Sequence, residues 1–296
     1  MSGFNKNFKD GSAGLRGGAN NASGGFQSSE AKSSEDGGGS DNSNPPIAFW
    51  DMEEGGEGTT ATDRSDAGNG LDLTIRDLGG GTIPTWDSGT KARGSYSLKI
   101  AGTKDQAFIA DNAKLDFNAN EAFSFSMWIK KVNSSSSSTA AFLSKMANSS
   151  PYRGYEVGFE SGQRPYFYLI STWGSAALGV KTSVAHMGSS AAWHHIVVTY
   201  DGSGSENGVT IYHNAVGKTR QSASDALLEF NTSDTLSAGD TTTNSDIFAL
   251  GSRASGLHNN IYMDDVAVFD YELTAAQVTS IYNSGNSLDV SDGIPA

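Results

Sequence analysis

The sequence predicts an all-β protein built as a two-sheet antiparallel sandwich, and three observations predict it. Hydrophobic residues alternate with polar ones along several segments of the second half, which is typical of strands with one buried face. Glycine is abundant, at 36 of 296 residues, and Gly, Ser, Asn and Asp fill the gaps between the segments. Only one segment, near the C-terminus, has the clear spacing of a helix.

The predicted strands follow one another with short polar turns between them. A first strand is expected where IAFWDMEEG begins at Ile47, and the later ones lie in residues 121–131, 142–146, 155–160, 193–202, 208–215 and the start of 261–283. Successive side chains of a strand point to opposite faces, so every second residue shares a face. The residues expected in the core from the two clearest segments are Phe123, Phe125, Met127, Ile129, Ile196, Val198 and Tyr200.

The last predicted strand carries an acidic residue in an unusual place. Counting by twos puts Asp264 on the same face as Val266 and Val268. A carboxylate in a core-facing row is costly unless it is paired or bound to a metal. Asp264 is therefore singled out as a residue with a specific role.

A single short helix is expected after this strand. Thr274 and Gln277 have the spacing of a capping box, and Val278 and Ile281 supply an apolar face. Gly285 is expected to end the helix.

Residues 1–46 are predicted to form a separate low-complexity arm, disordered or extended. They include 10 Gly, 9 Ser and 6 Asn, with Leu15 as the one branched aliphatic residue, so the segment cannot offset its ordering entropy by burial. Two interpretations are open, a flexible tether or an arm that folds onto a neighbouring subunit. The second has as its expected anchors Phe4, Phe8, Arg16 and Phe26. The globular domain is expected at residues 47–290 and a short tail at 291–296.

Composition argues against several partners. The net charge of −13 disfavours nucleic acid and anionic membranes, because both require basic patches. The absence of cysteine excludes disulfides and thiolate metal sites. The N-terminus has no apolar stretch of signal-peptide length, and no segment approaches the roughly 20 apolar residues of a membrane helix. We therefore expect a soluble chain that, if exported, leaves by a route other than a cleaved signal.

Several segments together resemble a known family. FSFSMWIK, LSKM, WHHIVVTYDG, IYHNAVG and YMDDVAVFDYELTAAQV resemble, in this order, the LamG-like, concanavalin A-like domains of the laminin G type 3 branch. The opening FWDMEEGGEGTTATDRSDAGNG is similar to the first strand and turn of that family, so the resemblance covers roughly residues 47–285. It implies a jelly roll of two packed antiparallel sheets.

The resemblance also implies a calcium site. The first and last strands of such folds often lie side by side, which would bring Asp51 and Glu53 towards Asp264, and members of the family often bind one calcium ion near such a position. Asp264 is therefore a candidate ligand, with Asp51, Glu53 or Asp63 beside it. The alternative, equally open, is that Asp264 caps backbone amides at a strand end.

Catalysis is not expected. Glycosidases of this fold that resemble laminarinases carry an E-x-D-x-x-E run that sets two carboxylates across a cleft, and the sequence has none. Glu156 and Glu160 lie four residues apart and are expected to face solvent. His194 and His195 are adjacent on a strand and point to opposite faces, so they cannot form one metal site.

Three aromatic residues are candidates for sugar binding. Trp173, Tyr152 and Trp86 lie in loop-like contexts, where an exposed ring can stack on a pyranose. Local packing is the alternative for each of them.

The expected function is a non-catalytic recognition or adhesion module on a virion surface, as a capsid-decorating or tail-associated protein. Its arm would attach to neighbouring subunits of a larger assembly, and its jelly roll would face outward to hold surface glycans. The alternative is a secreted or cell-surface carbohydrate-binding lectin or adhesin, and a glycosidase ranks third. Phage proteins with such domains are analogues in fold, which does not by itself establish function.

Overall fold

The computed structural model describes residues 45–79, 83–102, 104–133, 139–188, 192–230 and 235–294. The chain divides into two units, residues 1–40 and residues 41–296, and the description below concerns the second. The predicted anchors Phe4, Phe8, Arg16 and Phe26 lie outside the described residues. Within the described ranges, no helix is long and apolar enough to cross a membrane.

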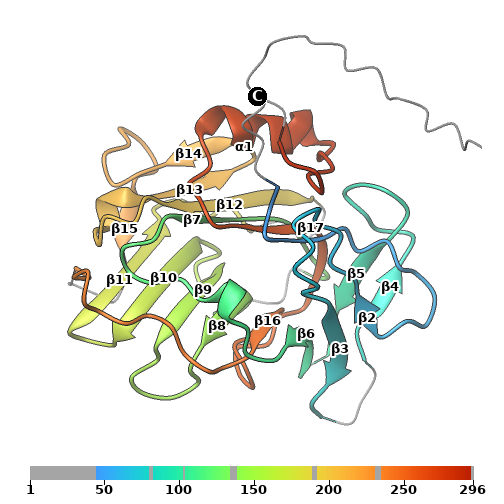
Figure 1. The fold of residues 1–296 in the computed structure, drawn as a ribbon. Coiled ribbons are helices and arrows are strands. Elements are labelled where there is room, and N and C mark those ends of the chain that lie inside the picture. Colours follow the sequence, from blue (N-terminus) through green and yellow to red (C-terminus); the bar gives the residue numbers. More distant parts are fainter. Residues whose placement is uncertain are drawn as a thin grey trace, which may run out of the picture. The chain divides into compact units, whose positions relative to one another are not determined.

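Two antiparallel sheets form the domain, as the alternation predicted (Figure 1). The first sheet contains, in order of pairing, β14 (Val216–Lys218), β13 (Val209–His213), β12 (His194–Tyr200), β7 (Phe123–Lys131), β17 (Ile261–Phe269), β5 (Ser97–Ile100) and β4 (Thr85–Asp87), with β1 (Ala48–Trp50) also paired to β17. The second contains β15 (Leu227–Glu229), β11 (Ala176–Thr182), β10 (Pro165–Thr172), β9 (Gly154–Phe159), β8 (Ala140–Met146), β16 (Phe248–Leu250), β6 (Asp105–Ile109), β3 (Leu73–Asp77) and β2 (Thr60–Ala61). Short 3-10 turns lie at η1 (Ala113–Leu115), η2 (Glu206–Gly208) and η3 (Asn283–Gly285).

The main core lies between the two sheets. All seven residues predicted to point inward from β7 and β12 are fully buried there, which confirms the alternation. Aromatic rings from both sheets meet in this layer, with Phe125 of β7 stacked on Tyr155 of β9 at a centroid distance of 4.9 Å. Burial of such large rings contributes much of the stabilisation of a sandwich.

The predicted helix is present as α1 (Ala275–Tyr282), which covers the outer face of the first sheet (Figure 1). The capping box of Thr274 and Gln277 is formed in both directions. The helix ends at Asn283, whose φ of 45° is left-handed, and not at the predicted Gly285.

A second apolar cluster lies between α1 and the first sheet. Val278 and Ile281 are buried in it against residues such as Val197 of β12. Val290 and Ile294 belong to the same cluster, so the packed domain continues at least to Ile294, beyond the boundary expected at 290.

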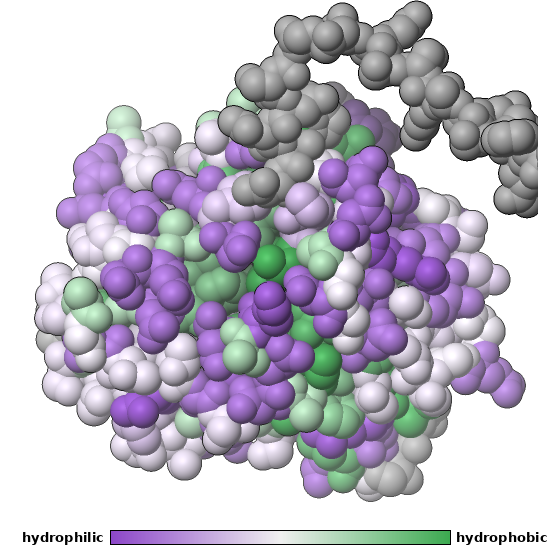
Figure 2. All heavy atoms as spheres, viewed as in Figure 1, coloured by the Kyte–Doolittle hydropathy of each residue, from purple (hydrophilic) through white to green (hydrophobic). Residues whose placement is uncertain are grey.

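The surface differs between the two sheets. Figure 2 shows a mainly hydrophilic face of the domain, with hydrophobic side chains gathered near its centre. On the outer face of the second sheet, a third apolar cluster is formed by Met146, Tyr166, Tyr168, Ile170, Ala177 and Phe230. Because α1, the one α-helix of the described ranges, packs on the other sheet, this cluster is available to form a site.

Candidate ligand-binding pocket

The floor of the pocket is a strand with large apolar residues on both faces. β10 lies between β9 and β11, and its Phe167 and Leu169 point into the main core. By alternation, Tyr166, Tyr168 and Ile170 point outward, where a sandwich strand usually carries polar side chains. These outward side chains are nevertheless buried, because they pack on one another and on neighbouring aromatic residues.

One wall is formed by two loops that are bonded to each other. Trp173 lies in the hairpin turn between β10 and β11, which Gly174 completes with a φ of +81°. The amide of Trp173 donates to the carbonyl of Pro151 at 3.1 Å, which joins this turn to the loop that carries Tyr152. The two rings meet edge to face at a centroid distance of 6.2 Å.

The opposite wall is Phe230, the residue that follows β15. Its ring stacks on that of Tyr168 at a centroid distance of 5.1 Å and an interplanar angle of 17°. Tyr168 also contacts Trp173 edge to face at 5.5 Å, and Tyr166 contacts Phe230 at 5.3 Å. This ring network fixes the orientation of each aromatic side chain before a ligand arrives, which lowers the entropic cost of binding.

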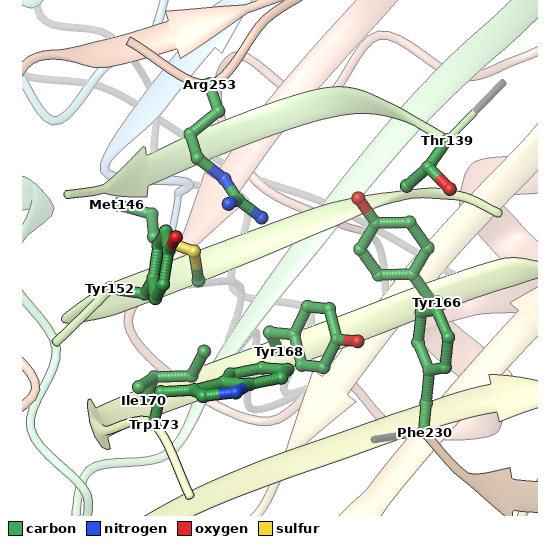
Figure 3. Close-up of a pocket in the computed structure, with 9 residues that line it drawn as sticks. All are labelled: Thr139, Met146, Tyr152, Tyr166, Tyr168, Ile170, Trp173, Phe230 and Arg253. Carbon is green, nitrogen blue, oxygen red and sulfur yellow. The ribbon is translucent and has the colours of Figure 1, made fainter. Parts of the chain in front are cut away.

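Together these groups enclose a cavity of about 340 Å³ (Figure 3). It is lined by Thr139, Met146, Tyr152, Tyr166, Tyr168, Ile170, Trp173, Phe230 and Arg253. Trp173 is 39% exposed, whereas the floor tyrosines are buried, so its ring is the part that a ligand meets first. The volume lies at the lower end of the roughly 300–1,000 Å³ of small-molecule sites.

A buried ion pair supplies the polar part of the pocket. Arg253 donates from Nε and Nη2 to the two carboxylate oxygens of Glu156, each at 2.6 Å. The Tyr166 hydroxyl donates to the same carboxylate at 2.7 Å. Glu156 and Glu160 were expected to face solvent, and this is wrong for both: the side chain of Glu156 is fully buried beneath the guanidinium, and Glu160 is buried beside Arg164 and Lys181.

The ionisation of these groups follows from their burial and from each other. Burial lowers the pKa of Arg253, but the hydrogen bonds and charge of Glu156 outweigh it, so that the pKa is raised. Burial and the Glu156 carboxylate both raise the pKa of Tyr166 well above its ordinary value. The arginine therefore stays charged and the tyrosine stays a hydrogen-bond donor.

The lining side chains of the pocket supply aromatic surfaces and hydrogen-bond donors. The nine lining residues include no carboxylate, and the nearby Glu156 is fully engaged by Arg253 and Tyr166. General acid–base hydrolysis of a glycosidic bond ordinarily requires two carboxyl groups across the substrate. An open indole ring and a guanidinium in one pocket suit a ligand with an apolar face and hydroxyl groups.

The sequence candidates for ligand binding are only partly brought together. Trp173 and Tyr152 are in contact and both line the pocket. Trp86 lies in β4 of the other sheet, where its indole N–H donates to the carbonyl of Gly58 at 2.9 Å and its ring packs against the main core. Trp86 is therefore not part of this site.

Seven of the nine lining residues escaped the sequence reasoning, among them Tyr166, Tyr168, Phe230 and Arg253. Tyr166 and Tyr168 carry a signal that could have revealed them, because PYFYLIST places aromatic residues on both faces of one strand. Phe230 and Arg253 carry no such signal, since they reach the pocket from loops distant in sequence from β10.

The acidic candidates gather at another place, beside β1 and β17. These first and last strands pair antiparallel, with Trp50 opposite Val266, as the resemblance implied. Asp264 is fully buried, and its Oδ2 accepts from the amides of Ala92 and Arg93 at 2.7 and 3.1 Å. Burial, and then the neighbouring Asp265 carboxylate, raise the pKa of Asp264 to about 8.

The predicted face of Asp264 is wrong. Its backbone partner is Trp128, on the side of β7 that points away from the main core, and the register shifts between Asp264 and Ala267. Asp265 has a φ of 42° at this irregularity, which is typical of a bulge. The extra residue returns Val266 and Val268 to the core and leaves Asp264 on the other face.

Neighbouring acids are also held by the chain itself. Glu53 accepts from the amides of Ser95 and Tyr96, and Asp63 accepts from the amides of Phe49 and Leu71 and so fixes the loop between them. Asp51 accepts from the amide of Glu53. Two nearby acids, Asp265 and Asp289, are paired with the guanidinium of Arg93.

The acidic side chains at this place accept hydrogen bonds from backbone amides. Calcium needs about six to eight oxygens around one point, whereas the carboxylates of Asp264 and Glu53 are turned towards amide groups. Among the described residues, no group of three or more acidic or histidine side chains is arranged to hold a metal. Calcium binding through Asp264, Asp51, Glu53 or Asp63 stays a prediction. Calorimetric titration with calcium, together with melting temperatures, tests it. The absence of both binding heat and a thermal shift, with and without chelator, would contradict it.

Comparison with known proteins agrees with the architecture. The family model of the concanavalin A-like lectin/glucanases superfamily matches residues 101–279. A search of curated proteins returned no match.

Solved structures with the same fold are distant in sequence. The binding domain of Paraclostridial mosquitocidal protein 1 matches with a TM-score of 0.53 and 16% identity, over 81% of this chain and 52% of that one. A structure of botulinum neurotoxin type C, whose cell entry depends on two ganglioside molecules, matches with a TM-score of 0.54 and 13% identity, over 81% and 51%. Trypanosoma rangeli sialidase in complex with 2,3-difluorosialic acid matches with a TM-score of 0.52 and 12% identity, over 82% and 33%.

The extent of these matches limits what they establish. The chain spans about half the length of the two toxin structures and a third of the sialidase, and at such identities the likeness concerns the fold alone. The family match covers more than half of the chain and agrees with the two-sheet architecture. The chain therefore belongs to the concanavalin A-like lectin/glucanases superfamily.

Proposed function

We propose that this domain is a carbohydrate-recognition module that holds a sugar in the aromatic pocket without cleaving it. The observation that carries the proposal is the exposed Trp173 ring at the mouth of a pre-formed aromatic cavity, across which lies the guanidinium of Arg253. A pyranose has an apolar C–H face that can stack on such a ring and hydroxyl groups that can accept from a guanidinium.

The comparisons support recognition more than catalysis. The superfamily includes lectins, and the toxin structures with this fold are named as binding domains or concern ganglioside-dependent cell entry. The sialidase match raises hydrolysis as an alternative. The absence of a carboxylate among the nine lining residues argues against it.

A glycan array on the full chain is the first experiment, followed by calorimetry with the sugars that bind. The Trp173→Ala variant is expected to weaken binding at least tenfold, because the stacking surface is lost. Trp86→Ala is the matched control, since it removes an equal ring from the other sheet, and it is expected to leave affinity unchanged.

Two results would contradict the proposal. One is that the folded wild-type protein binds no glycan on the array. The other is binding that survives Trp173→Ala but is lost in Trp86→Ala, which would move the site to β4.

We further propose, from the sequence, that residues 1–46 attach the domain to neighbouring subunits of a larger assembly on a virion surface, with a secreted or cell-surface lectin as the alternative. The division of the chain near residue 40 supports a separate arm. Deleting residues 1–46 is expected to leave the melting temperature and sugar affinity unchanged and to abolish incorporation into the assembly. A truncated protein that still assembles would contradict this role.

A further inference from the structure

The pocket contains one cationic group, and its charge is already balanced. Of the nine lining residues only Arg253 carries a formal charge, and Glu156 binds it through both carboxylate oxygens at 2.6 Å. Lys181 lies close by, over the ring of Phe230 at 4.4 Å, but it is not a lining residue and it pairs with Glu160 at 3.9 Å. The described part of the site is therefore electrically neutral.

From this we infer that the pocket selects uncharged pyranoses over acidic sugars, and that Glu156 sets this selectivity. The inference rests on the proposed sugar-binding function and names the ligand class of the same site. It distinguishes the chain from a binder of sialic acid or uronates, for which a free arginine is the usual carboxylate partner.

An anionic ligand would have to compete with Glu156 for the guanidinium. The side chain of Glu156 is fully buried, so it cannot turn to water when its partner is taken. Displacing it would leave a buried carboxylate with the Tyr166 hydroxyl as its remaining donor among the described residues. Binding next to Glu156 without displacing it would bring two negative charges together. In both cases an acidic sugar binds more weakly than a neutral one.

A neutral sugar meets neither penalty. A guanidinium has five N–H donors, and the hydrogen bonds of Arg253 in the described part of the chain use Nε and Nη2. Figure 3 shows the guanidinium reaching into the group of side chains opposite Tyr168 and Trp173. A ring that stacks on Trp173 can therefore present its hydroxyl groups to the remaining donors, while Glu156 holds the guanidinium in place.

The test compares each hexose with its own uronic acid, which differs only in the oxidation of C6. Calorimetry or ligand-observed NMR with methyl glycosides of glucose, galactose and mannose, with the matching uronates and with N-acetylneuraminic acid, gives the ratio of affinities. For the wild-type chain we expect the acid to bind at least tenfold more weakly than its neutral partner. We also expect the affinity for the neutral sugar to be independent of salt concentration.

Glu156→Gln is the decisive variant, because the amide keeps the shape and one acceptor for Arg253 but removes the negative charge. In this variant, we expect the uronate to bind as tightly as the neutral sugar or more tightly. We also expect its affinity for the uronate to fall with salt concentration, which the affinity of the wild type for neutral sugars does not. Arg164→Gln, which removes the partly exposed cation paired with Glu160 outside the pocket lining, is the matched control and is expected to keep the wild-type ratio.

The outcomes separate this inference from the proposed function. If the wild-type chain binds acidic sugars as tightly as neutral ones and Trp173→Ala abolishes both, the function stands and the inference is overturned. If no sugar binds the wild-type chain, both fail. Should Glu156→Gln not fold, the wild-type affinity ratio and its salt dependence still decide the question.

Discussion

Replacing Arg253 by methionine tests how much the ion pair beneath the pocket contributes to the fold. The Arg253 side chain is 15% exposed and that of Glu156 is not exposed at all, so the variant leaves a buried carboxylate without its charged partner. Breaking a buried pair in this way costs about 3–5 kcal/mol of unfolding free energy. A solvent-exposed pair contributes about 1 kcal/mol or less.

Urea denaturation followed by tryptophan fluorescence measures this difference. Arg164→Met is the matched control, because Arg164 is 33% exposed and the Glu160 carboxylate that it contacts at 3.3 Å keeps Lys181 at 3.9 Å as a second cation, so its loss is expected to cost under about 1 kcal/mol. The double variant Glu156→Gln, Arg253→Met removes both charges and is expected to recover about 2 kcal/mol relative to the sum of the single variants. If Arg253→Met costs no more than Arg164→Met, the pair is not a buried structural element and the argument for a neutral pocket fails with it.

Two further predictions concern the first sheet and its helix. Burial lowers the pKa of His195 to about 3, and because the unfolded imidazole protonates near its ordinary pKa of about 6.5, stability falls as the pH decreases through this window, by about 2 kcal/mol between pH 6.5 and 5. His195→Phe, which keeps a ring between Trp128 and Tyr282, should show a shallower decline of melting temperature with acidity than the wild type, and an identical decline would refute the assignment. Thr274→Ala removes the N-cap of α1 and is expected to cost about 0.5–2 kcal/mol in denaturation experiments. Thr279→Ala, in the middle of the same exposed helix face, should be neutral or stabilising, and equal losses in both variants would contradict the capping argument.

The elements that could be predicted from the sequence are those determined by local patterns. The inward residues of β7 and β12 follow from period-two alternation, and their complete burial confirms it. The start of α1 follows from the Thr274–Gln277 capping box, which depends on residues three apart. The end of α1 was misplaced because Asn283 adopts the left-handed conformation that glycine usually supplies.

The bulge in β17 lies beyond such patterns. Counting by twos assumes an unbroken strand, and a single residue with a φ of 42° at Asp265 reverses the face of everything before it. The bidentate contact of Arg93 with Asp265 accompanies this conformation, and the two residues are 172 positions apart in sequence. No local signal in the segment YMDDVAVF distinguishes the bulged strand from a regular one.

The pocket contains residues that local sequence patterns indicate and residues that only long-range contacts bring together. Trp173 and Tyr152 could be selected because loop positions favour exposed rings, and the structure brings them together. The ion pair could not be foreseen, since Glu156 and Arg253 are separated by 97 positions and meet only when β9 and the segment after β16 are folded. Glu156 in isolation has the sequence pattern of an ordinary solvent-facing charge.

The unequal coverage of the two sheets explains why the site lies where it does. On the first sheet, the outward residues Trp128 and His195 stack with each other and with Tyr282 of α1, so that the helix closes that face. On the second sheet, the outward ring of Tyr168 contacts Trp173, whose own ring is partly exposed to solvent. An exposed aromatic ring carries a cost in solubility that a purely structural turn would avoid by using a polar residue. The exposed Trp173 ring beside the buried rings of β10, with Arg253 fixed by Glu156 in the same pocket, is therefore the feature on which the proposed binding function depends.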